Sequence, residues 1–326
     1  MGMTAIESIG DEEAIRLLRA LQQRYTQNGQ NLSCYLEKLL YEKSLEYSDY
    51  LQTEVLLSLQ QPKTDFPDEM VFIGYHQVVE LYFKLILWEL EQLTSPEKLV
   101  SDVLFWEKVK RINRYYEKII ASFDIMSDGL DREQFGLFRK ALFPASGFQS
   151  LQYRLIEIMA TDLINLVAPQ YRAGVAGFEK AEDVYPYIYW KTGSLNKQNG
   201  EKNLTLRLFE KRYDAFLTKK TAEAKHSNLW AVFCRHYQAS ALLKDIAAAL
   251  RDFDYLANVV WCNMHYKAVA RHLMTREGEP VGSTAGTNWR QYLAPHFQQI
   301  VFFPDLWNET ELKNWGTMPQ LNHNKS

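Results

Sequence analysis

Two histidines lie on apolar helical faces, where an imidazole needs either a hydrogen-bond partner or a ligand. His76 follows Phe72 by one turn in the segment from Met70 to Leu93, and His265 follows Trp261 by one turn near the other end of the chain. Burying an unpartnered imidazole is costly, so each ring must bond a neighbouring group, a metal or a substrate. From spacing alone, a hydrogen-bonded core histidine is the favoured interpretation of both.

The spacing of possible metal ligands excludes several kinds of metal site. The sequence contains no HExxH motif, no pair of Glu-x-x-His motifs of the di-iron type and no facial-triad spacing. Its three cysteines, Cys34, Cys234 and Cys262, form no CxxC pair, which argues against a thiolate zinc site and a disulfide framework. Haem needs only one imidazole and is the metal cofactor most compatible with the sequence.

The segment from Phe135 to Gly147 contains a candidate anion-binding group. Arg139 lies between apolar residues, and a guanidinium in such surroundings favours a carboxylate that matches its fork. An ion pair within the protein is the favoured partner, and a bound carboxylate is the alternative. Ser146-Gly147 would let backbone N–H groups approach a ligand, although a simple turn is the more common role of such a break.

Other candidates have ordinary structural interpretations. The glycine-containing segment 278–286 follows a helix and no strand precedes it, which favours a helix C-cap and turn over a phosphate-binding loop. Tyr47 and Tyr50 are either packing aromatics or the hydroxyl-edged wall of a pocket, and Cys262 is interpreted as a small core residue. No Ser-His-Asp or Cys-His-Asn arrangement can be supported.

Helical periodicity dominates the chain and predicts an all-α fold. A stretch capped by Ser227-Asn228 continues to about Met274, as one very long helix or as two helices with a kink, and places Trp261, His265, Ala268 and His272 on one face. The segment near 169–226 is predicted to be an irregular insertion. Other helices are expected over 12–27, 67–93, about 103–123, from about 131, and 148–167.

Composition and charge restrict the possible partners. Hydrophobic residues make up 47% and aromatic residues 13% of the 326 residues, enough for a large core and an aromatic pocket. The net charge of −3, with both signs interspersed, predicts neither nucleic acid nor membrane as a partner. No leader and no apolar run of spanning length is recognised, and the cysteine usage suits a reducing compartment, so a cytoplasmic protein is expected.

One large domain is predicted over residues 31–315. Residues 1–30 are expected to form a partly mobile N-terminal segment, and residues 316–326 a disordered tail. Neither an internal repeat nor a low-complexity segment is found in the sequence.

Taken together, these motifs resemble the haem-dependent tryptophan 2,3-dioxygenase family, in matching order from about Leu45 to Trp307. Three blocks carry the resemblance. The first covers residues 47–51 with 57–62 and 68–81, the second 138–157, and the third 261–265 with Arg271, the glycine-containing loop and 303–307. The resemblance implies that long helices surround a haem pocket, that the protein binds haem b (iron protoporphyrin IX) and that it forms a homotetramer.

The resemblance also implies roles for individual residues. His265 matches the proximal iron ligand, and His76 the distal catalytic histidine that meets the substrate indole N–H. Phe72 matches the aromatic that packs on the indole, and Arg139 the clamp on the amino-acid carboxylate. The remaining matches are Leu142 in the substrate pocket, Ser146, Gly147 and Trp261 beside the haem, and Tyr47, Tyr50 and Leu51 in a segment that reaches into a neighbouring subunit's pocket.

Two departures concern the groups that hold the amino acid. Phe135 stands where the family usually has a tyrosine that also bonds the carboxylate, so one hydrogen bond worth roughly 1.5–3 kcal/mol would be missing. The family's Gly-Thr-Gly-Gly loop corresponds to 278–284, in which its threonine has no secure counterpart.

The function implied by the resemblance is insertion of O2 into the indole ring of L-tryptophan to give N-formylkynurenine, a step of tryptophan catabolism. The departures motivate an alternative, a haem monooxygenase or hydroxylase of tryptophan, a methylated tryptophan or another aromatic amino acid in secondary metabolism. A second alternative is a non-catalytic haem- or indole-binding protein.

Overall fold

The protein is helical throughout the part that the structure describes. The computed structural model describes residues 12–41, 46–95, 99–196, 199–274 and 293–317. Within these ranges there is no β-strand, and two isolated β-bridges occur, Val167 with Ile188 and Leu195 with Lys202. The all-α prediction is therefore confirmed.

The chain separates into two units, of which one ends at Leu59 and the other begins at Gln60. This division falls later than the one expected near residue 30. None of the helices in the first unit contains a buried residue. They are α1 (Glu12–Gln27), as the periodicity predicted, α2 (Leu32–Tyr41), α3 (Tyr47–Leu51) and α4 (Thr53–Leu57).

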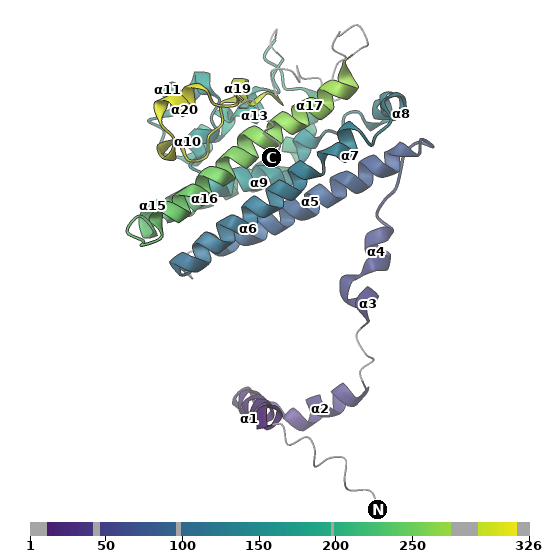
Figure 1. The fold of residues 1–326 in the computed structure, drawn as a ribbon, viewed down its shortest axis with the longest axis vertical. Helices are drawn as coiled ribbons and strands as arrows, with labels where there is room; N and C mark the ends of the chain where they lie inside the picture. Colours follow the sequence, from purple (N-terminus) through teal and green to yellow (C-terminus); the bar gives the residue numbers. More distant parts are fainter. Residues whose placement is uncertain (1–11, 42–45, 96–98, 197–198, 275–292, 318–326) are drawn as a thin grey trace, which may run out of the picture. The chain divides into compact units, whose positions relative to one another are not determined.

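Long helices that run side by side form the centre of the second unit (Figure 1). Helix α6 (Asp102–Ala121) packs between α5 (Asp68–Leu93) and α16 (Leu243–Tyr255), and α9 (Leu151–Ala160) covers another side of α5. A π-helical turn, η5 (Leu256–Val260), joins α16 to α17 (Trp261–Leu273). Aromatic and branched aliphatic side chains from α5, α6 and α16 fill the interior between these helices.

The second unit contains further helices, most of which are short. The α-helices are α7 (Phe123–Ser127), α8 (Arg132–Phe138), α10 (Leu163–Leu166), α11 (Arg172–Val175), α12 (Ala181–Val184), α13 (Tyr189–Thr192), α14 (Leu204–Ala224), α15 (Leu229–His236), α19 (Pro295–Gln298) and α20 (Glu309–Lys313). The 3-10 helices are η1 (Arg139–Leu142), η2 (Gly147–Gln149), η3 (Pro169–Tyr171), η4 (Tyr185–Tyr187) and η6 (Pro304–Leu306).

Capping side chains fix several of the predicted helix starts. The carboxylate of Asp131 accepts a hydrogen bond from the Gln134 N–H at 2.8 Å, and the Asn228 side chain accepts one from the Ala231 N–H at 2.8 Å. Each bond satisfies one of the N–H groups that a helix start leaves open. The starts expected at Asp68, near Asp131 and after Asn228 are all observed.

Two segments differ from the sequence prediction. The region expected to be irregular contains α14, a 21-residue helix that starts after the Asn203 cap. Its buried face includes Thr205 and Thr221, which blurs the apolar periodicity that reveals a helix. The stretch 227–274 is neither one helix nor a single kinked pair, because it is interrupted between α15 and α16 and again by the π turn.

By length and composition alone, α5 could cross a membrane, with a mean hydropathy of 1.3 over its most apolar window. Helices that pack in a protein interior pass the same test, and α5 contacts α6 and α9.

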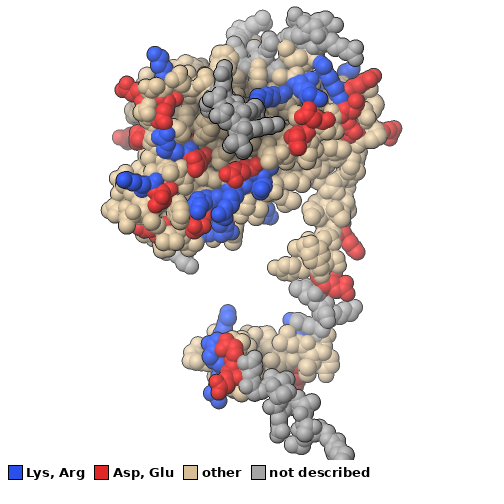
Figure 2. Space-filling model, in the orientation of Figure 1, with Lys and Arg blue, Asp and Glu red and all other residues tan. Residues whose placement is uncertain are grey.

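Charged side chains of both signs lie close together on the face drawn in Figure 2. Charges also pair where side chains are largely covered: Glu210, with a side chain 11% exposed, pairs with both Lys191 and Lys202.

Candidate active site

Helices α5 and α17 bring His76 and His265 into one aromatic neighbourhood. The ring centroid of Tyr75 lies 5.5 Å from that of His76 and 6.0 Å from that of Phe123, which in turn lies 6.1 Å from that of His265. The His76 imidazole also acts electrostatically on His265 and contributes to lowering its pKa. The two histidines, 189 positions apart in the sequence, therefore belong to the same site.

His265 is a neutral imidazole without a hydrogen-bond partner among the described residues. Burial is the main cause that lowers its pKa from 6.5 to about 4, so the ring carries no charge near neutral pH. One turn earlier on α17, the Trp261 ring lies 5.5 Å from the His265 ring. A neutral imidazole keeps a nitrogen lone pair, which is what a metal ligand requires.

His272, on the same helix face, has one bonded ring nitrogen, while its buried Nδ1 has no partner among the described residues. Its Nε2 lies 2.6 Å from the Met126 carbonyl oxygen and must donate to it, because a carbonyl only accepts. The contact anchors α17 to α7, and it is the role that spacing alone favoured for His265. Because that partner is found for His272 and not for His265, the two histidines have different functions.

His76 presents one defined nitrogen to the site. Its Nδ1 lies 2.7 Å from the Phe72 carbonyl oxygen and therefore carries the proton. Burial lowers the pKa of His76, so the ring is neutral and Nε2 holds an unshared electron pair. The backbone of α5 thus fixes the tautomer, and Nε2 can accept a hydrogen bond from an N–H donor.

Phe72 begins an aromatic wall that leads to Arg139. The Phe72 ring lies 4.1 Å from the His76 ring, 5.9 Å from that of Phe135 and 5.7 Å from that of Phe138, centroid to centroid. Arg139 follows directly at the start of η1, half-buried, and burial lowers its pKa. This partial burial is compatible with the predicted apolar surroundings of the guanidinium, which stay a prediction.

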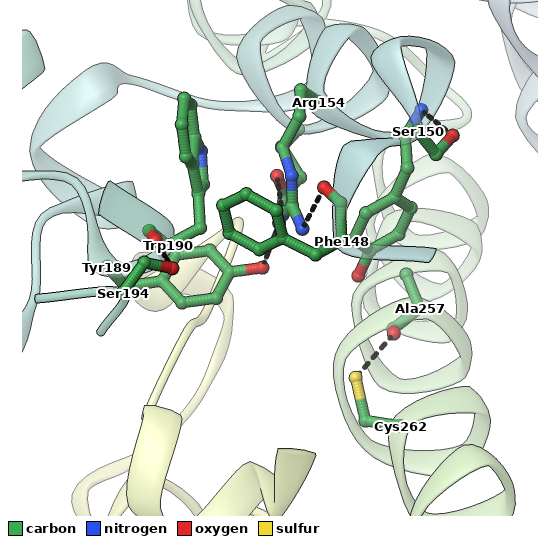
Figure 3. Close-up of polar contacts among 10 residues, drawn as sticks. Phe148, Ser150, Arg154, Tyr189, Trp190, Ser194, Ala257 and Cys262 are labelled. Carbon is green, nitrogen blue, oxygen red and sulfur yellow. Dashed lines mark hydrogen bonds and ion pairs between the residues drawn. The ribbon is translucent and has the colours of Figure 1, made fainter. Parts of the chain in front are cut away.

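Other predicted site residues follow Arg139 in the sequence. Leu142 ends η1 and is half-buried. The Ser146 hydroxyl accepts from the Phe148 N–H and caps η2, while Gly147 is exposed, with open space where a side chain would be. A buried network fixes the residues that follow, as Figure 3 shows. In it the Arg154 guanidinium donates to the Phe148 carbonyl oxygen at 3.4 Å.

Two other predicted parts of the site are not tested by the structure. Tyr47, Tyr50 and Leu51 lie on α3 of the first unit, where their side chains are exposed. The segment 278–286 lies outside the described residues. The roles implied for both stay predictions.

The structure adds two aromatic residues that sequence reasoning missed. Tyr75 and Phe123 link the histidines, but Tyr75 is only the neighbour of His76 in the sequence and Phe123 opens the short helix α7. An apolar stripe identifies Phe123 as a core residue, and only the packing of α7 on α17 shows that it faces His265.

A separate cleft of roughly 330 Å³ lies between α9, α12 and α14. Its lining includes Asp162, Lys180 and Lys225 and none of the predicted site residues. The candidate site is therefore the neighbourhood of the two histidines.

Comparisons with known proteins point to one family. Residues 33–177 match the family model described as tryptophan 2,3-dioxygenase. A tryptophan 2,3-dioxygenase of Ruegeria sp. (strain TM1040) is 29% identical over 273 residues, covering 83% of this chain and 93% of the relative. The chain is similar to the tryptophan 2,3-dioxygenase family over most of its length. A relative of the same name from Herpetosiphon aurantiacus, also 29% identical, covers 81% of this chain and 97% of its own length.

The similarity to this family makes haem the cofactor against which the donor set is tested. The described residues contain no group of three or more His, Cys, Asp and Glu side chains that could hold a metal ion. They do contain the neutral His265, and beside it the buried Trp261 Nε1–H, which has no hydrogen-bond partner within the described ranges. One available imidazole in aromatic surroundings fits haem, which needs a single protein ligand.

The low pKa of His265 predicts an acid-sensitive haem-free protein. The unfolded chain binds a proton on this histidine below about 6.5, whereas the folded chain does so only near 4, so stability is lost as the pH falls through this window. We expect urea unfolding of the haem-free protein to show this loss, and His265→Gln to reduce it. Asp254, whose pKa is raised to about 6, acts in the opposite direction, but it is present in both proteins. Equal pH slopes for the two would contradict the assignment.

Proposed function

We propose that the protein is a haem-dependent dioxygenase that opens the indole ring of L-tryptophan to N-formylkynurenine, with both atoms of O2 entering the product. One observation carries the proposal. A neutral histidine without a partner among the described residues, His265, shares an aromatic site with a second neutral histidine, His76, whose tautomer is fixed. The relatives compared above are all named tryptophan 2,3-dioxygenase.

In this proposal His265 binds the iron of haem b through its unprotonated nitrogen, and Trp261, Ser146 and Gly147 lie beside the haem. The bound haem supplies the oxygen chemistry, and the protein supplies binding and orientation. The Trp261 Nε1–H is a buried donor that an acceptor on the cofactor would satisfy. Burial keeps His265 unprotonated, and hence able to bind iron, over the physiological pH range.

The substrate is held by groups with separate tasks. His76 Nε2 accepts the indole N–H, because Nδ1 is committed to the Phe72 carbonyl oxygen. The Phe72 ring packs on the indole, and Arg139 binds the carboxylate. Since the pKa of His76 is lowered, it orients the ring by hydrogen bonding and need not remove the proton. Such fixed orientation is itself a large contribution to rate.

Labelled oxygen tests the reaction type. With ¹⁸O2 and L-tryptophan, the product is expected to carry two labelled atoms and the mass of N-formylkynurenine. A product with one labelled atom would overturn the proposal in favour of a monooxygenase. Full haem loading without tryptophan-dependent O2 uptake under reducing conditions would overturn it in favour of a binding protein.

Arg139→Ala should separate recognition of the amino acid from recognition of the ring. Loss of a charged hydrogen-bonding partner is expected to raise KM for L-tryptophan roughly 10–100-fold. The effect on 3-methylindole, which lacks the carboxylate, should be much smaller. Lys140→Ala removes an exposed neighbouring cation and serves as the control. Steady-state kinetics that give equal effects on both substrates would argue against a carboxylate clamp.

The assembly is proposed to be a cytoplasmic homotetramer in which α3 of one subunit completes the pocket of another. Support comes from large apolar side chains exposed in the first unit, among them Leu40 at 82%, Tyr41 at 86% and Tyr47 at 77%. Exposed apolar surface of this kind marks an interaction site. Light scattering should give four times the chain mass, and a monomer would refute the tetramer.

A further inference from the structure

An extra residue is accommodated between the two helices that lead to His265. His265 lies 19 positions after Ile246, and His272 lies 19 positions after Phe253. At 3.6 residues per turn, 19 positions of a regular α-helix leave a side chain about 100° away from the starting direction. Ile246, Phe253 and His272 are nevertheless all buried, so α16 and α17 must meet out of the regular register.

The π turn η5 supplies this correction. In a π turn, a backbone N–H bonds the carbonyl oxygen five residues earlier, so the turn holds one more residue than an α-helical turn. This extra residue offsets a rotation of about 100°. His265 therefore faces the same side as the core residues of α16. Figure 3 shows the turn beside the buried Arg154 network, with the Cys262 thiol donating to the Ala257 carbonyl oxygen, five residues earlier, at 3.5 Å.

A buried carboxylate connects this π turn to the chain's C-terminal segment. Asp254 is fully buried and accepts from the Asn258 amide, within the turn, at 2.8 Å. It also accepts from the backbone N–H groups of Phe302 at 2.8 Å and Phe303 at 3.0 Å, and from the Trp307 Nε1–H at 3.0 Å. Burying a carboxylate without a cation is costly, and four donors offset that cost here.

We propose that Asp254 and Asn258 hold the π turn and thereby set the position of His265 at the iron, which makes both of them positioning residues for the cofactor. The proposal rests on the haem-binding function proposed above. Groups that orient a metal ligand from behind commonly change metal affinity or activity 10–100-fold when removed. Asp254 and Asn258 act on His265 through the helix backbone, since their side chains are bonded elsewhere.

Asn258→Ala is the decisive variant, because it removes the bond into the π turn and keeps the three bonds to the C-terminal segment. We expect a shifted Fe–His stretching band in the resonance Raman spectrum of the ferrous protein, and haem dissociation roughly 10-fold faster. Asp254→Asn should show the same spectral shift. Asn228→Ala, which removes a buried cap of α15 far from the turn in the sequence, controls for general destabilisation and should leave the band in place.

Cys262 gives a second readout that does not depend on haem. In a Cys34→Ser, Cys234→Ser background, its buried thiol should react slowly with a thiol reagent, and roughly 10-fold faster when Asn258→Ala loosens the turn. An unchanged Raman band together with an unchanged labelling rate in Asn258→Ala would overturn the proposal. If the parent protein bound no haem, or if His265→Ala kept the parent spectrum, the proposed function would fail instead, whatever the labelling rates.

Discussion

Replacing His265 with alanine is expected to abolish stable haem binding. The neutral imidazole has no hydrogen-bond partner among the described residues, so binding iron is the role that uses its lone pair. Loss of an outer-shell partner typically costs 10–100-fold in metal affinity, and loss of the ligand itself should exceed about 100-fold. Haem titration followed at the Soret band measures the effect, and added imidazole should restore part of the binding.

His272→Ala is the matched control for this prediction. It removes a histidine from the same face of α17, but one whose Nε2 is bonded to the Met126 carbonyl oxygen. We expect this variant to lose stability and to keep its haem spectrum. A normal Soret band in His265→Ala would refute the ligand assignment. Loss of haem from His76→Ala alone would reverse the proximal and distal roles.

Helix starts could be predicted from the sequence because their signals are local. Asp131 and Asn228 are residue types that favour helix caps, and the structure has helices beginning after both. The amphipathic pattern of α1 also gave its observed limits. The hydrogen bonds that cap α8 and α15 connect residues three positions apart, so both partners lie within one short stretch of the sequence.

The π turn and the difference between the two histidines of α17 could not be predicted in the same way. Asp254, which we propose holds the π turn, has four donors, and three of them lie 48 to 53 positions away. Similarly, the Met126 carbonyl oxygen that satisfies His272 lies 146 positions from it. Spacing therefore placed Trp261, His265 and His272 on one face correctly but could not say which imidazole was already bonded.

The resemblance supplied what local patterns lacked, because it carries long-range information from relatives. The resemblance implies that His76 and His265 belong to one site, and the structure has them in one aromatic neighbourhood. It could not explain Phe135, which in the structure packs 4.8 Å from the His272 ring, centroid to centroid. Because this is a contact between two aromatic rings, the apolar ring of Phe135 is suited to it.

The Arg154–Glu157 pair behind the site leads to the second large expected effect. The guanidinium donates to the Glu157 carboxylate at 2.8 Å, and their side chains are 4% and 1% exposed. Burial raises the pKa of Glu157, while the charge of Arg154 opposes this change. The Tyr189 hydroxyl also donates to Glu157, at 2.5 Å. Each of the two charges is therefore stabilised in the interior by the other.

Glu157→Ala should accordingly destabilise the protein by about 3–5 kcal/mol, because it leaves a buried guanidinium uncompensated. Chemical unfolding measures the loss. The double variant Arg154→Met, Glu157→Leu, which removes both charges, should recover much of it, whereas Glu223→Ala at an exposed pair should change little. A double variant as unstable as the single one would mean that the aromatic cage around Arg154, and not charge compensation, dominates. Since Arg154 also holds the Phe148 carbonyl oxygen, Glu157→Ala should loosen the adjoining Ser146-Gly147 segment and weaken haem binding as well.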